Sequence, residues 1–140
     1  MPKAPVPAEV DAFLRAANPA VITSVRPDGQ PVSVATWYLW EDGRILVNMD
    51  EGRKRLEYLR AEPRVTLTVL DGTDSYTHVS LQGRVAELRD DPDLVDIDRL
   101  ARHYTGGPYH ERERHRVSAL IDVARWHGWG AHENKDVHHH

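Results

Sequence analysis

Three consecutive cations, Arg53-Lys54-Arg55, are the residues of this chain whose type and position most clearly imply chemistry. They follow Gly52 and an apolar, strand-like run at 45–49, and they open a helical segment that ends before Pro63. The first turn of a helix carries unpaired N–H groups and the positive end of the helix dipole, so cations there are normally disfavoured by roughly 0.3–1 kcal/mol each. A bound phosphate would remove this conflict, because helix N–H groups and Lys or Arg side chains all favour the same negative group. The cluster therefore predicts an anion site.

A solvated helix face, on which Glu51 or Glu57 partly balances the cations, is the competing interpretation. The cluster lacks the Walker pattern, so nothing supports a nucleoside triphosphatase. Asn48 and Met49 end the preceding strand, where a ligand at the helix start could contact them; a strand end with one core methionine is the alternative.

Tyr76 and His78 lie two residues apart at the start of a predicted strand, so their side chains are expected on one face. They are interpreted either as one wall of a pocket or as an ordinary half-buried aromatic pair.

Other chemistries find little support in the sequence. His103, His110 and His115 match no compact metal-ligand spacing, and no metal site is predicted. The serines lack a nucleophile-elbow sequence, which removes the motif for hydrolase chemistry. Four tryptophans are interpreted as core and dimer-interface residues: Trp37, Trp40, Trp126 and Trp129.

The composition indicates one domain over residues 1–137, and the three terminal histidines at 138–140 fit the remnant of an expression tag. A net charge of -4 argues against a general nucleic-acid binder. The chain has no cysteine, which excludes disulfides and thiolate metal sites and suits an intracellular protein. No run approaches the roughly 18 apolar residues of a membrane span, and no signal peptide opens the chain. We therefore expect a cytoplasmic protein with no membrane partner.

The hydrophobic patterns predict the elements that must position the cations. Strands are expected at 20–25, 30–39, 44–49, 64–70, 76–88 and 116–124, and helices at 8–17, 53–61 and 91–104. Arg26-Pro27-Asp28-Gly29 predicts a hairpin turn and 41–43 a second turn. Gly83 predicts a bulge or a point of close approach in a long strand. Six strands with three helices indicate a mainly β fold, a small antiparallel barrel with peripheral helices.

Several short motifs occur in an informative order. They are residues 20–31, Trp37-Tyr38, Gly52-Arg53-Lys54-Arg55, residues 58–65, residues 81–85 and Tyr104-Thr105-Gly106. In this order they resemble the split β-barrel flavin and deazaflavin proteins, the superfamily of pyridoxamine-phosphate oxidase, and more closely its coenzyme F420-dependent branch. The resemblance implies a six-stranded antiparallel split β-barrel that forms a homodimer with its pocket at the interface.

The resemblance also implies roles for individual residues. Arg53 and Arg55 match the positions that hold the cofactor phosphate, with Lys54 as an additional candidate. Arg55 stands where many members have lysine, which keeps the charge but changes its geometry. Asn48 and Met49 match the strand end that contacts the ring system of the cofactor, and Val32, Val34 and Ala35 match the strand beneath the ring. Tyr76 and His78 match wall positions that the second subunit supplies.

The function implied is an F420-dependent oxidoreductase that transfers hydride between the deazaflavin and a small unsaturated or conjugated substrate. FMN-binding oxidases of the superfamily commonly carry Ser-Arg-Lys at the helix start; here the serine is absent, and residues 126–129 do not show the oxidase pattern. An FMN-binding oxidase-like protein or flavin reductase and a non-catalytic cofactor carrier are the alternatives. No obligatory general acid is identified, although Tyr76 or His78 could donate a proton.

Overall fold

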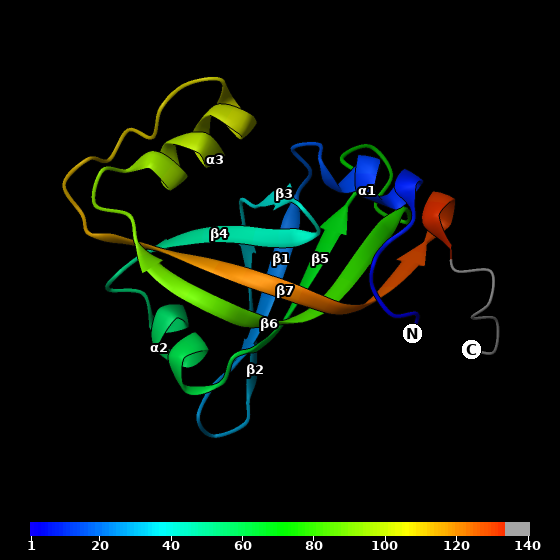
Figure 1. Ribbon diagram of the computed structural model, residues 1–140, viewed down its shortest axis with the longest axis horizontal. Coiled ribbons are helices and arrows are strands. Elements are labelled where there is room, and N and C mark those ends of the chain that lie inside the picture. Colours follow the sequence, from blue (N-terminus) through cyan, green and yellow to red (C-terminus); the bar gives the residue numbers. More distant parts are fainter. Residues whose placement is uncertain (134–140) are drawn as a thin grey trace.

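A single antiparallel sheet of seven strands dominates the computed structural model, which describes residues 1–133 (Figure 1). The order across the sheet is β2-β1-β5-β6-β7-β4-β3. The strands are β1 (Ala20–Val25), β2 (Pro31–Thr36), β3 (Leu39–Glu41), β4 (Arg44–Asp50), β5 (Arg64–Leu70), β6 (His78–Asp90) and β7 (Arg116–Trp129). The helices are α1 (Ala8–Leu14), α2 (Lys54–Ala61), α3 (Val95–Thr105) and the short 3-10 helix η1 (Gly130–His132). The mainly β prediction with peripheral helices is confirmed, while the tag prediction at 138–140 lies outside the described residues.

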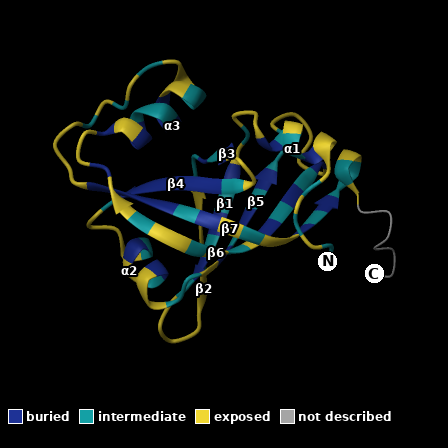
Figure 2. Cartoon of the chain, viewed as in Figure 1, coloured by how far each residue is buried: buried dark blue, intermediate teal, exposed yellow. Residues whose placement is uncertain are grey.

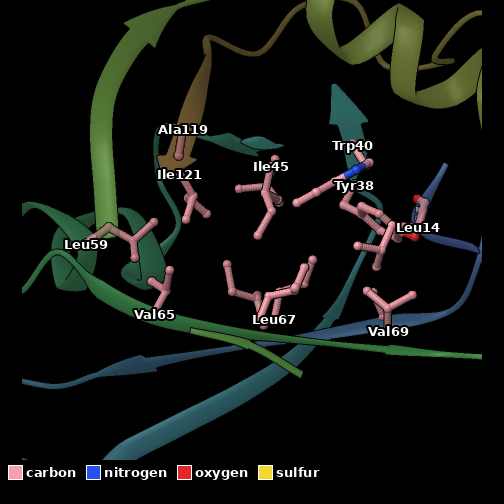
Figure 3. Packing of buried hydrophobic residues seen from close by; sticks show 14 of the residues in the cluster. Leu14, Tyr38, Trp40, Ile45, Leu59, Val65, Leu67, Val69, Ala119 and Ile121 are labelled. Atoms are coloured by element: carbon pink, nitrogen blue, oxygen red, sulfur yellow. Dashed lines mark hydrogen bonds between the residues drawn. The ribbon is translucent and has the colours of Figure 1, made fainter. Parts of the chain in front are cut away.

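The main core packs residues of the sheet against residues of α1 and α2. Alternate residues of β1 and β5 are buried, as their alternation of apolar and semi-polar side chains predicts. Figure 3 shows Leu59 of α2 at one end of this core, Leu14 and Tyr38 at the other, and Ile45 and Leu67 between them. Burying side chains of this size stabilises the fold by roughly 1.5–3 kcal/mol each. The core fixes α2 against the sheet and so fixes the position of the cation cluster.

The strand predicted at 30–39 is in fact two strands, because Trp37 and Tyr38 leave the ladder between β2 and β3. The Tyr38 side chain is fully buried, and its hydroxyl donates to the Leu14 carbonyl at 2.7 Å, which pulls the chain inward there. As a result β2 and β3 lie at opposite edges of the sheet. The predicted count of six strands is therefore wrong: the sheet has seven strands and is not closed between its two edges, which is consistent with the predicted split barrel.

Helix boundaries differ from the predictions for local reasons. Helix α1 ends at Leu14 instead of residue 17, because the side-chain amide of Asn18 donates to the Phe13 carbonyl at 2.7 Å and takes over the helix end. Helix α3 begins at Val95 instead of residue 91, because Leu94 has a left-handed backbone with φ 59°. The Asp91 carboxylate accepts from backbone N–H groups at the start of this helix.

The peripheral helices sit in different places. In the view of Figure 1, α3 and the loop after it stand above β4 and β7, whereas α2 lies below β6. Figure 2 shows α3 with one buried and one exposed face, consistent with its small second core of Leu94, Ile97 and Leu100. Among residues 1–133, no helix combines the length and the apolar character that crossing a membrane requires.

The two longest strands extend beyond their predicted ends and pair with each other. Strand β6 begins at His78 and continues to Asp90, and β7 continues to Trp129. Their register shifts between Gln82 and Gly83, where the unpaired extra residue is Ala124 of β7, so the bulge lies opposite Gly83 and the prediction of a close approach at Gly83 is the one confirmed. A Cβ on Gly83 would lie 2.1 Å from the Asp122 carbonyl oxygen, so only glycine allows the strands to approach this closely.

Gly83→Ala is expected to lower the free energy of unfolding by roughly 2–4 kcal/mol, because the strand backbones must separate to admit the methyl group. Urea denaturation measures the change. Gly72→Ala is the control, since its Cβ would meet nothing nearer than Pro19 Cδ at 3.8 Å. Equal stability of the two variants would contradict the close approach at Gly83.

Candidate functional site

A cavity of about 530 Å³ lies beside the start of α2, and we call it the cation cavity. It is lined by residues of β1, β2, β4, α2 and the first residue of β7. Eight of the ten predicted cofactor residues line it: Val32, Val34, Ala35, Asn48, Met49, Arg53, Lys54 and Arg55. Ser24, Asp50, Gly52, Tyr58 and Arg116 complete the lining. The fold thus gathers predicted residues from three separate stretches of sequence around one space.

The turn between β4 and α2 is organised by Asp50. One of its carboxylate oxygens accepts from the Gly52 N–H at 2.9 Å, and the other accepts from Arg114 Nη1 at 2.7 Å. These bonds hold the pKa of Asp50 below its ordinary value. Arg53 then takes the N-cap position with an extended backbone and no side-chain cap. The predicted helix start at Arg53 is therefore the N-cap, and the helix itself begins one residue later at Lys54. The first turn has no side-chain cap, so its free N–H groups lie next to the clustered cations.

The three clustered cations have different environments. The Lys54 side chain is 80% exposed, with its Nζ 3.9 Å from a Glu57 carboxylate oxygen, so the solvated-face interpretation describes this residue well. Arg53 is exposed and forms no ion pair with any residue of the described part of the chain. Arg55 is half-buried, and its Nε is buried without a hydrogen-bond partner.

Burial lowers the pKa of the Arg55 guanidinium, and the charges of Arg53 and Arg116 lower it further. An arginine nevertheless remains protonated at neutral pH, because its ordinary pKa is above 12. Three guanidinium groups therefore line the cavity, and the one with an unsatisfied buried donor, Arg55, is repelled by the other two. An anion is the chemical group that would satisfy this arrangement.

Arg116 is the candidate site residue that sequence reasoning missed. It is only 8% exposed, and its Nε donates to Asn48 Oδ1 at 2.7 Å. Its guanidinium carbon lies 4.8 Å from the centroid of the Tyr109 ring. Arg116 has no carboxylate within ion-pair distance among residues 1–133. The available signal was a cation at the head of the apolar run 117–121, a position where a charge must have a reason to be buried.

A buried hydrogen-bond chain fixes the orientation of Asn48. Its Nδ2 donates to Asp91 Oδ2 at 3.2 Å and to Ser118 Oγ at 2.9 Å, and Ser118 Oγ donates in turn to Asp96 Oδ2 at 2.6 Å. With both donors used, the Asn48 carbonyl oxygen is left for Arg116. This series of hydrogen bonds therefore positions the Arg116 guanidinium.

A second cavity, of about 620 Å³, adjoins the first, and we call it the aromatic cavity. It shares Ala35, Asn48 and Arg116 with the cation cavity. Its other lining residues come from the α1–β1 connection, β1, β2 and its end, the end of β5, α3 and the loop after α3: Ala17, Pro19, Ala20, Val21, Thr36, Trp37, Leu70, Ile97, Leu100, Tyr104 and Tyr109. The two spaces meet at one polar junction.

The aromatic cavity has stacked walls. The Trp37 and Tyr104 rings stack with centroids 5.5 Å apart, and Tyr109 meets Trp37 edge-on at 6.2 Å. The Tyr104 hydroxyl donates to the Asn18 carbonyl at 2.7 Å. Burial raises the pKa of Tyr104 to about 12, so this hydroxyl stays protonated at neutral pH.

Tyr76 and His78 lie apart from both cavities. Tyr76 is in the turn before β6 and is 66% exposed, while His78 is the first residue of the strand. The predicted strand start at Tyr76 is wrong, so the strand rule behind the same-face prediction does not apply to this turn residue. The His78 ring nitrogen Nδ1 lies 3.0 Å from the Tyr76 carbonyl oxygen. Their predicted role as a wall for a second subunit remains a prediction.

The fold also brings His115 near two carboxylates, a grouping that the sequence spacing does not indicate. Ligand atoms of Glu51, Asp90 and His115 lie within 4.8 Å of one another, and all three residues are exposed. Arg60 already pairs with Glu51 at 3.3 Å. His115 Nε2 lies 3.2 Å from an Asp90 carboxylate oxygen and 3.7 Å from a Glu51 carboxylate oxygen.

Comparison with solved structures finds the same fold in several proteins. An F420 reductase superposes with a TM-score of 0.78 at 24% identity, covering 86% of this chain and 98% of that one. A conserved hypothetical protein from Mycobacterium tuberculosis gives 0.70 at 26% identity, covering 99% and 92%. A putative pyridoxamine 5'-phosphate oxidase from Listeria innocua gives 0.64 at 18% identity, covering 86% and 94%.

Comparison with curated proteins gives no match. The family model described as pyridoxamine 5'-phosphate oxidase, in contrast, matches residues 6–130, which include every element from α1 to β7 and both cavities. The chain therefore belongs to the pyridoxamine 5'-phosphate oxidase family.

Proposed function

We propose that this protein is an F420-dependent oxidoreductase that transfers hydride between the deazaflavin and a small unsaturated or conjugated substrate. The observation that carries the proposal is the cation cavity. There the buried Nε of Arg55 has no hydrogen-bond partner, and Arg53 and Arg116 add two further positive charges to the lining. Membership of a flavin-related family supports a phosphate-bearing cofactor as that anion. The likeness in fold to an F420 reductase, and the absence of a serine before Arg53-Lys54, favour the deazaflavin over FMN.

The residues present fit such a cofactor. Arg53 and Arg55 would bind the phosphate through charge-assisted hydrogen bonds, and the uncapped N–H groups of α2 add to this attraction. Val32 and Val34 on β2, with Met49 at the end of β4, would form the apolar floor beneath the ring. When bound, the deazaflavin would supply the hydride, while the protein supplies placement and electrostatics.

The junction between the two cavities supports hydride transfer between neighbouring ligands. Ala35, Asn48 and Arg116 line both spaces, so a cofactor in the cation cavity would lie next to a substrate in the aromatic cavity. The apolar walls of the aromatic cavity would exclude water from the reacting atoms.

A titration series is expected to identify the cofactor. The purified protein should be colourless, bind F420 with micromolar or tighter affinity, and bind FMN and haem at least tenfold more weakly, as followed by fluorescence and absorbance. A yellow preparation that prefers FMN would favour the FMN-binding alternative. Tight F420 binding without hydride exchange with any acceptor would favour the carrier alternative.

A homodimer is the second expectation that belongs to this function. The edge strand β2 is mostly exposed, with Val34 39% exposed, and it carries part of the proposed cofactor floor. A second copy covering this edge would enclose the cation cavity and bury the apolar side chains. Sedimentation equilibrium should therefore give twice the mass of 16.0 kDa. A monomer that still binds the cofactor would refute the dimeric site.

A further inference from the structure

The aromatic cavity holds one charge within apolar surroundings. Of the described residues that line it, Arg116 is the only charged one. Arg116 lines both the aromatic cavity and the cation cavity, and its guanidinium lies over the Tyr109 ring. A cation in such a place needs an anionic partner to offset its desolvation.

Most of the other polar side chains around this space are already engaged, while the neutral Tyr109 hydroxyl forms no hydrogen bond among residues 1–133. Thr36 Oγ1 donates to the Trp37 carbonyl at 2.9 Å, the Tyr104 hydroxyl donates to Asn18, and the Asn48 amide is fully used. Arg116 uses only its Nε, and its two terminal nitrogens form no hydrogen bond with any residue of the described chain. The free charged donors at the junction are thus the two terminal nitrogens of the Arg116 guanidinium.

We propose that the aromatic cavity selects planar aromatic or conjugated acids, with the ring system against Trp37 and Leu100 and the carboxylate on the terminal nitrogens of Arg116. A guanidinium binds a carboxylate through two parallel hydrogen bonds, a geometry that an apolar cavity strengthens. A single charge matches one carboxylate, whereas a phosphate dianion finds more cations in the adjoining cation cavity. That these acids are the substrates of hydride transfer rests on the proposed function. Their binding to Arg116 does not require the cofactor.

The experiment compares two probes of equal shape, 2-naphthoate and neutral 2-naphthamide, titrated by calorimetry into the full chain without added cofactor. Naphthoate is expected to bind at least tenfold more tightly than naphthamide. Arg116→Gln should abolish this preference. Arg102→Gln is the matched control, because it removes a charge from an exposed position of α3 outside both cavities and should leave the preference intact. Ala17→Trp, at an exposed lining position, should weaken both probes by obstructing the space.

Equal affinity for the acid and the amide in the unmodified protein would overturn the proposal, and this comparison needs no variant to fold. An equal loss in Arg102→Gln and Arg116→Gln would also overturn it, since general charge would then explain the preference. So would an Arg116→Gln protein that loses F420 affinity but keeps its naphthoate preference, because Arg116 would then serve the cofactor. F420 titration of the same samples reports separately on the proposed function: a naphthoate preference without F420 binding refutes only the cofactor.

Discussion

Replacing Arg53 and Arg55 together by alanine is expected to weaken F420 binding by roughly two to four orders of magnitude. Each guanidinium that forms a charge-assisted hydrogen bond to the phosphate contributes about 1.5–3 kcal/mol, and about 1.4 kcal/mol corresponds to a tenfold change in affinity. The loss should be near the upper end if Arg55 is the main ligand, since its Nε is the buried donor that lacks a partner. Fluorescence titration of the deazaflavin measures the affinity of both proteins.

Stability provides the discriminating readout for this double variant. Arg53 and Arg116 both repel Arg55 in the protein without a ligand, so removing Arg53 and Arg55 should leave the thermal midpoint unchanged or raise it. Arg60→Ala is the control on the same helix, because Arg60 is exposed, pairs with Glu51 and lies outside the cation cavity. Undiminished F420 affinity in the double variant would show that the phosphate binds elsewhere. A fall in both stability and affinity would indicate that the arginines serve the fold instead.

The elements that sequence reasoning predicted correctly are those whose cause is local. Strands β1 and β5 have the predicted bounds, because alternation of buried and semi-polar residues is set within each strand. The turn ending at Gly29, with φ 89°, follows from its own residues. The split of the predicted strand 30–39 has a distant cause, the bond from the Tyr38 hydroxyl to α1, and no pattern within that strand reveals it.

The candidate site likewise contains residues that local sequence reveals and residues that only the folded structure reveals. The cation cluster at the start of α2 conflicts with a local rule about helix ends, and so the sequence alone draws attention to it. Arg116 is recognisable only after β4 and β7 have paired, when Asn48 lies opposite Ser118 and Asp50 opposite Arg116. The placement of Tyr76 in a turn depends on Asp74, whose side chain accepts from its N–H at 3.2 Å and so delays the start of β6.

Asp91 joins the site to the helix that covers it. Its carboxylate accepts from the backbone N–H of Asp96 at 3.1 Å and of Ile97 at 2.9 Å, which caps α3 across the left-handed residue Leu94. The same carboxylate accepts from Asn48, the residue that positions Arg116. Loss of Asp91 should therefore affect both the helix that covers the aromatic cavity and the orientation of Arg116 in that cavity.

Asp91→Ala is expected to lower the free energy of unfolding by roughly 3–5 kcal/mol, because it removes a helix cap and leaves buried donors unsatisfied. Chemical denaturation measures this loss, and hydrogen exchange should show that protection falls first in α3. Asp93→Ala is the matched control: it removes an equal charge two residues away, from an exposed side chain with no hydrogen bond or ion pair among residues 1–133. If Asp91→Ala destabilised no more than Asp93→Ala, the carboxylate would not connect α3 to the sheet. Conversely, if stability fell but α3 kept its protection, the buried bond to Asn48 would matter more than the cap.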